Sequence, residues 1–248
     1  MAAFEIEAKW VNVANGDLQI DAYLAQPQGE GSFPGIVVFQ EIFGVNAHVR
    51  DVTERIAREG YVALAPALYQ RLEPGFEVGY SEEELKKGRE YKVQTKASEL
   101  LSDTQASLDY LKRLPNTTDR FGNIGFCFGG HVAYLTATLD DFKAVASFYG
   151  AGIATLCPGE ENGATIDRTK DISGTVYAFF GTEDPLIPLE EVDRIETALT
   201  EQGVSHQIFR YEGATHGFFC DRRESYNETV ARQAWERVLE LYNTQLKD

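Results

Sequence analysis

The chain has 248 residues, and its 43% of hydrophobic and 25% of charged residues are ordinary values for a globular protein, which argues against disorder. Its 39 acidic residues outnumber its 23 basic ones, and the net charge of −16 argues against nucleic acid or an anionic membrane as the main partner. The apolar runs are far shorter than the roughly 18 residues of a membrane helix, and the N-terminal sequence MAAFEIEAKW lacks the apolar core of a signal peptide.

The predicted elements begin with a hairpin. Two alternating segments, Glu5–Ala14 and Leu18–Gln26, flank Asn15-Gly16-Asp17, and Asn-Gly between such segments is a strong hairpin signal. The apolar run that follows, Gly35–Phe39, is typical of a strand buried on both faces. Further strands are expected at Tyr61–Ala65, Asn123–Phe126, Lys143–Tyr149, Thr175–Phe180 and Gln207–Tyr211. Helices are expected at residues 46–59, from about Glu82, at residues 96–113, and at Gly129–Leu139, Leu189–Gln202 and Tyr226–Leu246.

Strands that alternate with helices in this way predict an α/β fold with a mostly parallel sheet, helices on both faces and an antiparallel N-terminal edge. The chain contains no repeat and no linker, so a single domain over residues 1–248 is expected. Ligands of such sheets bind beyond the carboxyl ends of the strands. The residues that follow each strand are therefore the candidates for function.

The three cysteines, Cys127, Cys157 and Cys220, and the four histidines form no CxxC, HExxH or mixed cluster. An odd number of isolated cysteines argues against a disulfide framework and predicts a cytoplasmic protein. The histidine spacing gives no support for a zinc site. We expect a metal-free monomer or small homo-oligomer.

A turn between an expected strand and an expected helix carries the first candidate catalytic residue. Cys127 occupies the nucleophile position of the G-x-Nuc-x-G pattern in Gly125-Phe126-Cys127-Phe128-Gly129-Gly130. The small flanking glycines let the chain approach itself, and the following helix directs its positive end at the sulfur, which favours the thiolate. The backbone N–H of Phe128 would point toward a developing oxyanion. The alternative is that Cys127 is a small buried hydrophobic residue.

Two later loops carry an acid and a histidine. Asp184 follows the strand Thr175–Phe180 and suits the role of orienting an imidazole, with a turn aspartate that caps the next helix as the alternative. His216 lies in a Gly-flanked loop after the last strand and suits a general base, although a lone loop histidine also has structural uses. The order Cys127, Asp184, His216, each after a strand, is the nucleophile–acid–base order of α/β-hydrolases.

In these motifs the chain resembles the dienelactone hydrolase (carboxymethylenebutenolidase) family of α/β-hydrolases over nearly its whole length. The resemblance is carried by the cysteine turn and by Gln40-Glu41-Ile42-Phe43-Gly44, Gly181-Thr182-Glu183-Asp184 with Ile187-Pro188, and Thr215-His216-Gly217-Phe218. It implies an α/β-hydrolase fold and a Cys127–His216–Asp184 triad. It also implies an oxyanion hole formed by the N–H groups of Phe128 and Ile42, and no metal or organic cofactor.

Glu41 ends a buried strand and points an acid toward the expected site. The resemblance implies that this glutamate lies beside Cys127 and helps to govern its protonation, because an acid within hydrogen-bond reach of a thiol disfavours the thiolate. The alternative is a strand-end glutamate in a salt bridge.

Substrate recognition departs from the family pattern. The resemblance implies that arginines and a tyrosine hold a substrate carboxylate. Tyr91 matches the tyrosine, but Lys87 stands where one arginine is expected and Cys220 where another is. Lysine holds a carboxylate less specifically than the arginine fork does. Arg222 and Arg223 follow Cys220 and are candidate substitutes, with solvated charges as the alternative.

These residues predict a cysteine-dependent hydrolase of a small-molecule lactone or ester. One alternative is an esterase or thioesterase that uses the same triad on a non-anionic substrate, which the lost arginine favours. The other is a non-hydrolytic ligand-binding protein on the same fold, since a fold does not determine a function.

Overall fold

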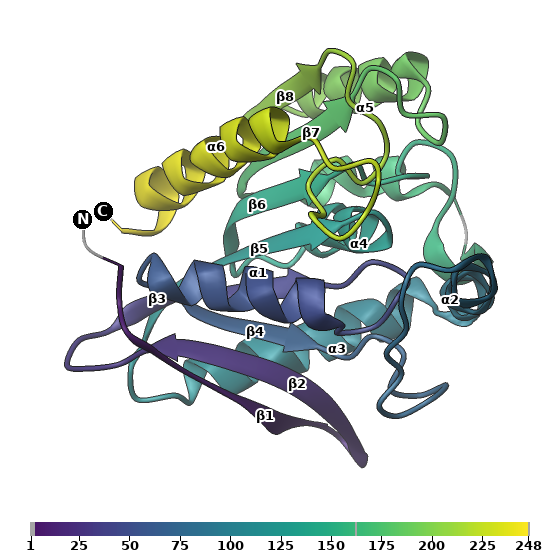
Figure 1. Cartoon of the computed structure of the whole chain (residues 1–248). Helices are drawn as coiled ribbons and strands as arrows, with labels where there is room; N and C mark the ends of the chain where they lie inside the picture. Colours follow the sequence, from purple (N-terminus) through teal and green to yellow (C-terminus); the bar gives the residue numbers. More distant parts are fainter. Residues whose placement is uncertain (1–2, 162, 248) are drawn as a thin grey trace.

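An eight-stranded sheet in the order β1-β2-β4-β3-β5-β6-β7-β8 runs through the computed structural model, which describes residues 3–161 and 163–247 (Figure 1). Strand β1 pairs antiparallel with β2, and β2 pairs antiparallel with β4, whereas all later neighbours pair in parallel. The predicted mostly parallel sheet with an antiparallel N-terminal edge is therefore confirmed. The strands are β1 (Ile6–Asn15), β2 (Leu18–Pro27), β3 (Phe33–Phe39), β4 (Val62–Pro66), β5 (Thr117–Phe126), β6 (Phe142–Phe148), β7 (Thr175–Gly181) and β8 (His206–Tyr211).

Helices cover both faces of the sheet, also as predicted. Figure 1 shows α1 and α6 on one face, α3, α4 and α5 on the other, and α2 beyond the carboxyl ends of the parallel strands. Their bounds are α1 (Ala47–Arg58), α2 (Glu82–Gln94), α3 (Ala97–Lys112), α4 (Phe128–Thr136), α5 (Leu189–Glu201) and α6 (Glu228–Leu246). Within residues 3–161 and 163–247, no helix combines the length and the apolarity that crossing a bilayer demands.

Helix α1 is stabilised both by the packing of its apolar face and by a side-chain cap at its N-terminus. Its apolar residues Val49, Val52 and Ile56 recur at helical spacing and are all buried. Burying one such side chain stabilises the fold by about 1.5–3 kcal/mol, whereas the cap made by the Asn46 side chain to the N–H of Val49 contributes about 1 kcal/mol. Packing against β2 and β4 therefore dominates.

The main difference from the predicted elements is the start of β5. The apolar pattern predicts a strand from Asn123, but β5 begins at Thr117 and pairs there with Phe33 of β3. The first four of the added residues are polar and partly or fully exposed, so backbone pairing rather than burial extends the strand there, whereas Phe121 and Gly122 are buried. Short 3₁₀ helices at Pro158–Glu160 and Thr165–Asp171 were not predicted either.

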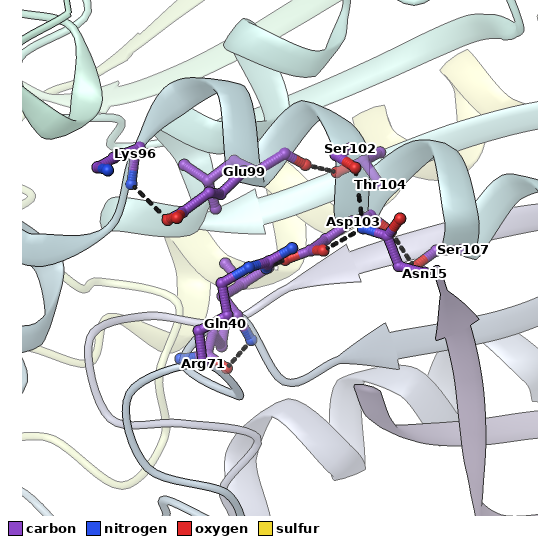
Figure 2. Close-up of polar contacts among 11 residues, drawn as sticks. Asn15, Gln40, Arg71, Lys96, Glu99, Ser102, Asp103, Thr104 and Ser107 are labelled. Atoms are coloured by element: carbon purple, nitrogen blue, oxygen red, sulfur yellow. Dashed lines mark hydrogen bonds and ion pairs between the residues drawn. The ribbon is translucent and has the colours of Figure 1, made fainter. Parts of the chain in front are cut away.

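A buried polar network anchors the loop that follows β4 (Figure 2). Asp103 of α3 is almost fully buried, accepts a hydrogen bond from Asn15 at 2.7 Å and forms an ion pair with Arg71. The side chain of Gln40, at the end of β3, accepts a hydrogen bond from the N–H of Leu68 at 3.1 Å. A buried charge is tolerated only when it is paired in this way. The network holds the loop against α3 and so positions the residues that reach the site.

Candidate active site

Cys127 lies in a strained turn between β5 and α4. Its φ of 55° and ψ of −114° are rarely adopted by residues with a side chain. A Cβ atom on Gly125 would lie 1.9 Å from the carbonyl oxygen of Gly129, and one on Gly129 would lie 2.3 Å from that of Phe39. The flanking glycines are thus required by close backbone approach, as the sequence pattern predicts. The turn leaves the Cys127 side chain partly exposed at the N-terminus of α4.

The structure brings together the two other residues of the candidate triad. The Nδ1 atom of His216 lies 2.8 Å from Oδ2 of Asp184, whose Oδ1 accepts a hydrogen bond from the N–H of Leu186. The Nε2 atom of His216 is buried and has no hydrogen-bond partner within the described chain. Burial alone lowers the pKa of His216, but the charge of Cys127 and the hydrogen bond to Asp184 outweigh it and raise the pKa to about 10. At neutral pH the ring is therefore protonated, and Nε2, on the side of the ring away from Asp184, carries one of its two protons.

The two backbone N–H groups expected to form the oxyanion hole lie at the ends of two segments. Phe128 is the first residue of α4, and Ile42 lies in the turn after β3. In the described part of the chain, neither N–H donates a hydrogen bond to another backbone group of a turn or loop. Helix α2 packs directly on this turn, because a Cβ atom on Gly88 would lie 2.3 Å from the carbonyl oxygen of Ile42. That contact explains a glycine in the middle of a helix.

Glu41 is buried and forms an ion pair with an arginine. Its Oε1 atom accepts a hydrogen bond from Nη1 of Arg223 at 3.1 Å, and its Oε2 atom is buried without a partner in the described chain. Burial raises the pKa of the Glu41 carboxyl, and the charges of Arg223 and His216 oppose that rise. The salt bridge that sequence analysis gave as the alternative is thus present, close enough to the site for Glu41 and His216 to influence each other.

The residues expected to hold a substrate carboxylate already hold a carboxylate of the protein. Lys87 lies 2.8 Å from Oε2 of Glu73, and the hydroxyl of Tyr91 donates a hydrogen bond to the same oxygen. The Tyr91 ring packs on Tyr69, whose ring in turn stacks on Phe128. Glu73 was not singled out from the sequence, because a charge pair between a loop and a helix leaves no local pattern.

The two arginines after Cys220 differ in position. Arg222 is exposed, whereas Arg223 reaches inward to Glu41 and lies over the rings of Phe43 and Tyr80. Cys220, at the position of the expected arginine, is fully buried with its sulfur 3.3 Å from the hydroxyl of Tyr80. Burial and the nearby charge of Glu41 raise the pKa of this thiol to about 11, so Cys220 is a poor nucleophile.

Tyr149 lies next to the candidate triad, and sequence analysis named it only as the end of a strand and not as a site residue. It follows β6 with a φ of 36°, and its ring centroid lies 5.1 Å from that of His216. Its hydroxyl is buried without a hydrogen-bond partner in the described residues. Its place at the carboxyl end of a buried strand is the signal that could have identified it.

A sheet of this order, with a strained turn after β5 and loops after β7 and β8 that bring an acid to a histidine, defines an α/β-hydrolase. Comparison with known proteins agrees. The sequence model of the dienelactone hydrolase family matches residues 20–246. The chain belongs to this family and is a hydrolase.

Several relatives span almost the whole chain. A Synechocystis protein provisionally named a carboxymethylenebutenolidase is 53% identical over 244 residues, covering 98% of this chain and 99% of the relative. A Yersinia pestis protein with the same provisional name is 33% identical over 234 residues, covering 92% and 85%. The crystal structure of a provisionally titled dienelactone hydrolase from Klebsiella pneumoniae superposes with a TM-score of 0.87 at 29% identity, covering 96% of this chain and 98% of that one.

Proposed function

We propose that this hydrolase opens a lactone or cleaves an ester of a small molecule through Cys127, His216 and Asp184. The observation that carries the proposal is the orientation of His216. Its Nδ1 is held by Asp184, which leaves its buried, unpartnered Nε2 for the nucleophile. Asp184 fixes both the tautomer and the ring position, as an acid does in other nucleophile–histidine–acid triads.

In the proposed reaction, the Cys127 thiolate attacks the carbonyl carbon, and the N–H groups of Phe128 and Ile42 stabilise the oxyanion. The tetrahedral intermediate collapses to a thioester, and the imidazolium of His216 gives its Nε2 proton to the departing alkoxide. His216 then takes a proton from water, which attacks the thioester and releases the carboxylate. In a lactone the alkoxide stays tethered to the acyl group, so a single hydroxy acid is released.

The proposal assigns Glu41 to control of the nucleophile's protonation. Its Oε2 atom, which has no partner in the described chain, and a pKa that burial raises support this assignment. Burial favours the protonated carboxyl, and a neutral carboxyl repels a thiolate less than a carboxylate does. The ion pair with Arg223 opposes protonation and so makes the charge of Glu41 depend on where Arg223 lies.

For the substrate, we propose Lys87 and Tyr91 as the subsite for a carboxylate, with Arg223 rather than the exposed Arg222 as the arginine nearest the site. A second candidate, an esterase for non-anionic substrates, is favoured by two specific observations. Glu73 occupies the Lys87 and Tyr91 donors, and Cys220 replaces an expected arginine. We further propose a cytoplasmic location, which the free cysteines Cys127, Cys157 and Cys220 support.

The test compares hydrolysis of a dienelactone and of a neutral activated ester by wild type, Cys127→Ala and His216→Ala. Each variant is expected to lose about a thousandfold or more in kcat/KM, because the triad acts as a unit. His206→Ala is the matched control, since His206 lies at the opposite end of β8 from the His216 loop. Near-wild-type activity in Cys127→Ala would overturn the mechanism. Cleavage of the neutral ester alone would select the second candidate.

A further inference from the structure

A cavity of about 790 Å³ lies beside the candidate catalytic residues, between α2, the N-terminus of α4 and the segment after β6. Cavities of roughly 300–1,000 Å³ hold drug-sized ligands, so this one exceeds the needs of a compact lactone. None of the three candidate triad residues is among the described residues that line it, but residues close in the chain to Cys127 and Asp184 are. Phe128 follows Cys127, and the N–H of Leu186 is bonded to Asp184.

The walls of the cavity expose large apolar side chains to water. Val93, Leu156 and Leu186 all line it, and they are 66%, 42% and 50% exposed. Single exposed leucines need no explanation, but a group gathered around one concave site indicates a surface that a ligand covers. Phe128 and Ala151 extend the apolar wall toward Cys127.

The charges around the cavity do not select an ion. Arg89 and Lys92 lie on the α2 side, and Glu160, Glu161 and Glu191 also line the cavity. Glu161 is held by Ser98 and Arg168, which leaves cations and acids in balance. A group that enters this cavity is therefore selected by its apolar surface and not by its charge.

The position of the histidine distinguishes the two halves of an ester. The departing alkoxide must lie near His216, which donates the proton. Among the described residues that line the cavity, none comes from the loop that carries His216. This arrangement favours the acyl half of an ester over the departing half as the occupant of the cavity.

We propose that the cavity is the subsite for an apolar acyl chain, and that the substrate is a neutral ester with a medium-length or aryl-bearing acyl group. This inference rests on the proposed hydrolase mechanism and names its substrate class. Phe128 supplies both a candidate oxyanion donor and part of the cavity wall, which places the cavity next to the position expected for the reacting carbonyl.

The test measures kcat/KM for p-nitrophenyl esters from acetyl to octanoyl. Wild type is expected to prefer octanoyl over acetyl by about tenfold or more, since each buried methylene contributes to binding. In the double variant Leu156→Ser with Leu186→Ser, that preference is expected to fall about tenfold. Leu189→Ser is the matched control, because Leu189 is 40% exposed but does not line the cavity. A wild type without chain-length preference, or an equal loss of preference in the control, overturns the subsite.

A binding measurement separates this inference from the mechanism. The probe is octanamide, an amide analogue of the octanoyl ester, and its binding to Cys127→Ala, which lacks the proposed nucleophile, is followed by calorimetry. We expect binding that the Leu156→Ser and Leu186→Ser substitutions weaken and the Leu189→Ser substitution does not. Binding with no turnover of any ester supports the subsite and overturns the hydrolase mechanism. Turnover of all the esters at one rate, with no octanamide binding, overturns the subsite alone.

Discussion

At the scale of single residues, the site depends on opposing effects on His216. Burial favours the neutral imidazole, whereas Cys127 and Asp184 favour the imidazolium, and the second effect is larger. The pKa of His216 is therefore raised from its ordinary value near 6.5 to about 10. A raised pKa means that the ring keeps its proton through neutral pH and loses it only as the pH rises through about 10. If His216 is the acid that protonates the leaving group, as proposed, its proton is present over the whole neutral range.

The pH profile tests this balance. If the imidazolium is the acid, kcat/KM for a neutral ester should fall as the pH rises toward about 10. Asp184→Asn removes one of the groups that raise the pKa of His216, so the alkaline limb should move down by about 1–3 pH units. The measurement is kcat/KM from neutral pH to pH 11, with Glu183→Gln as the matched control because Glu183 is the exposed neighbour of Asp184. An unmoved limb in Asp184→Asn would exclude His216 as the titrating acid.

At the scale of elements, α2 packs against the candidate site and carries the candidate substrate-binding residues Lys87 and Tyr91. Gly88 lets the helix lie on the turn that carries Ile42, and Tyr69 donates a weak hydrogen bond of 3.4 Å to the Gly88 carbonyl. The same placement brings Lys87 and Tyr91 into contact with Glu73. The pKa of Glu73 is lowered, and the hydrogen bond with Lys87 is the largest cause. If Lys87 and Tyr91 form the proposed carboxylate subsite, the carboxylate of Glu73 competes with that of the substrate.

Removing that carboxylate should change specificity. Glu73→Gln frees Lys87 and Tyr91, so KM for a carboxylate-bearing lactone should fall about three- to tenfold while KM for a neutral ester stays constant. The fold should tolerate the change, because exposed ion pairs contribute little to stability. Steady-state kinetics on both substrates measures the effect. The control is Glu83→Gln, an exposed residue of α2, the helix that carries Lys87 and Tyr91. Equal changes for the two substrates would show that Lys87 and Tyr91 do not bind a substrate carboxylate.

The elements also show what a sequence can predict. The order of strands and helices follows from apolar periodicity, and α2 begins at Glu82 as expected, behind a capping box formed by Ser81 and Glu84. The loops with Asp184 and His216 were found because each follows a strand of the parallel sheet, and the carboxyl ends of parallel strands lie at one edge of the sheet. The ion pair between Glu41 and Arg223 was not predicted, because the two residues lie 182 positions apart in the sequence and only the packed fold brings them together.

At the scale of the whole molecule, the net charge of −16 opposes the approach of anionic substrates. Two effects compete when salt is added. Screening weakens the long-range repulsion, and it also weakens the attraction of local cations such as Lys87. The repulsion comes from many charges spread over the surface, whereas Lys87 already has Glu73 as its partner. The long-range effect should therefore dominate.

Ionic strength thus separates the two substrate classes. Between about 10 mM and about 150 mM salt the screening length falls from about 30 Å to about 8 Å. Over this range kcat/KM for a carboxylate-bearing lactone should rise severalfold, and kcat/KM for a neutral octanoyl ester should stay constant. The measurement is initial rates well below KM, with both substrates in the same buffers. A fall in kcat/KM for the lactone would show that local cations control the approach of the substrate, and would favour a substrate with a carboxylate over a neutral ester.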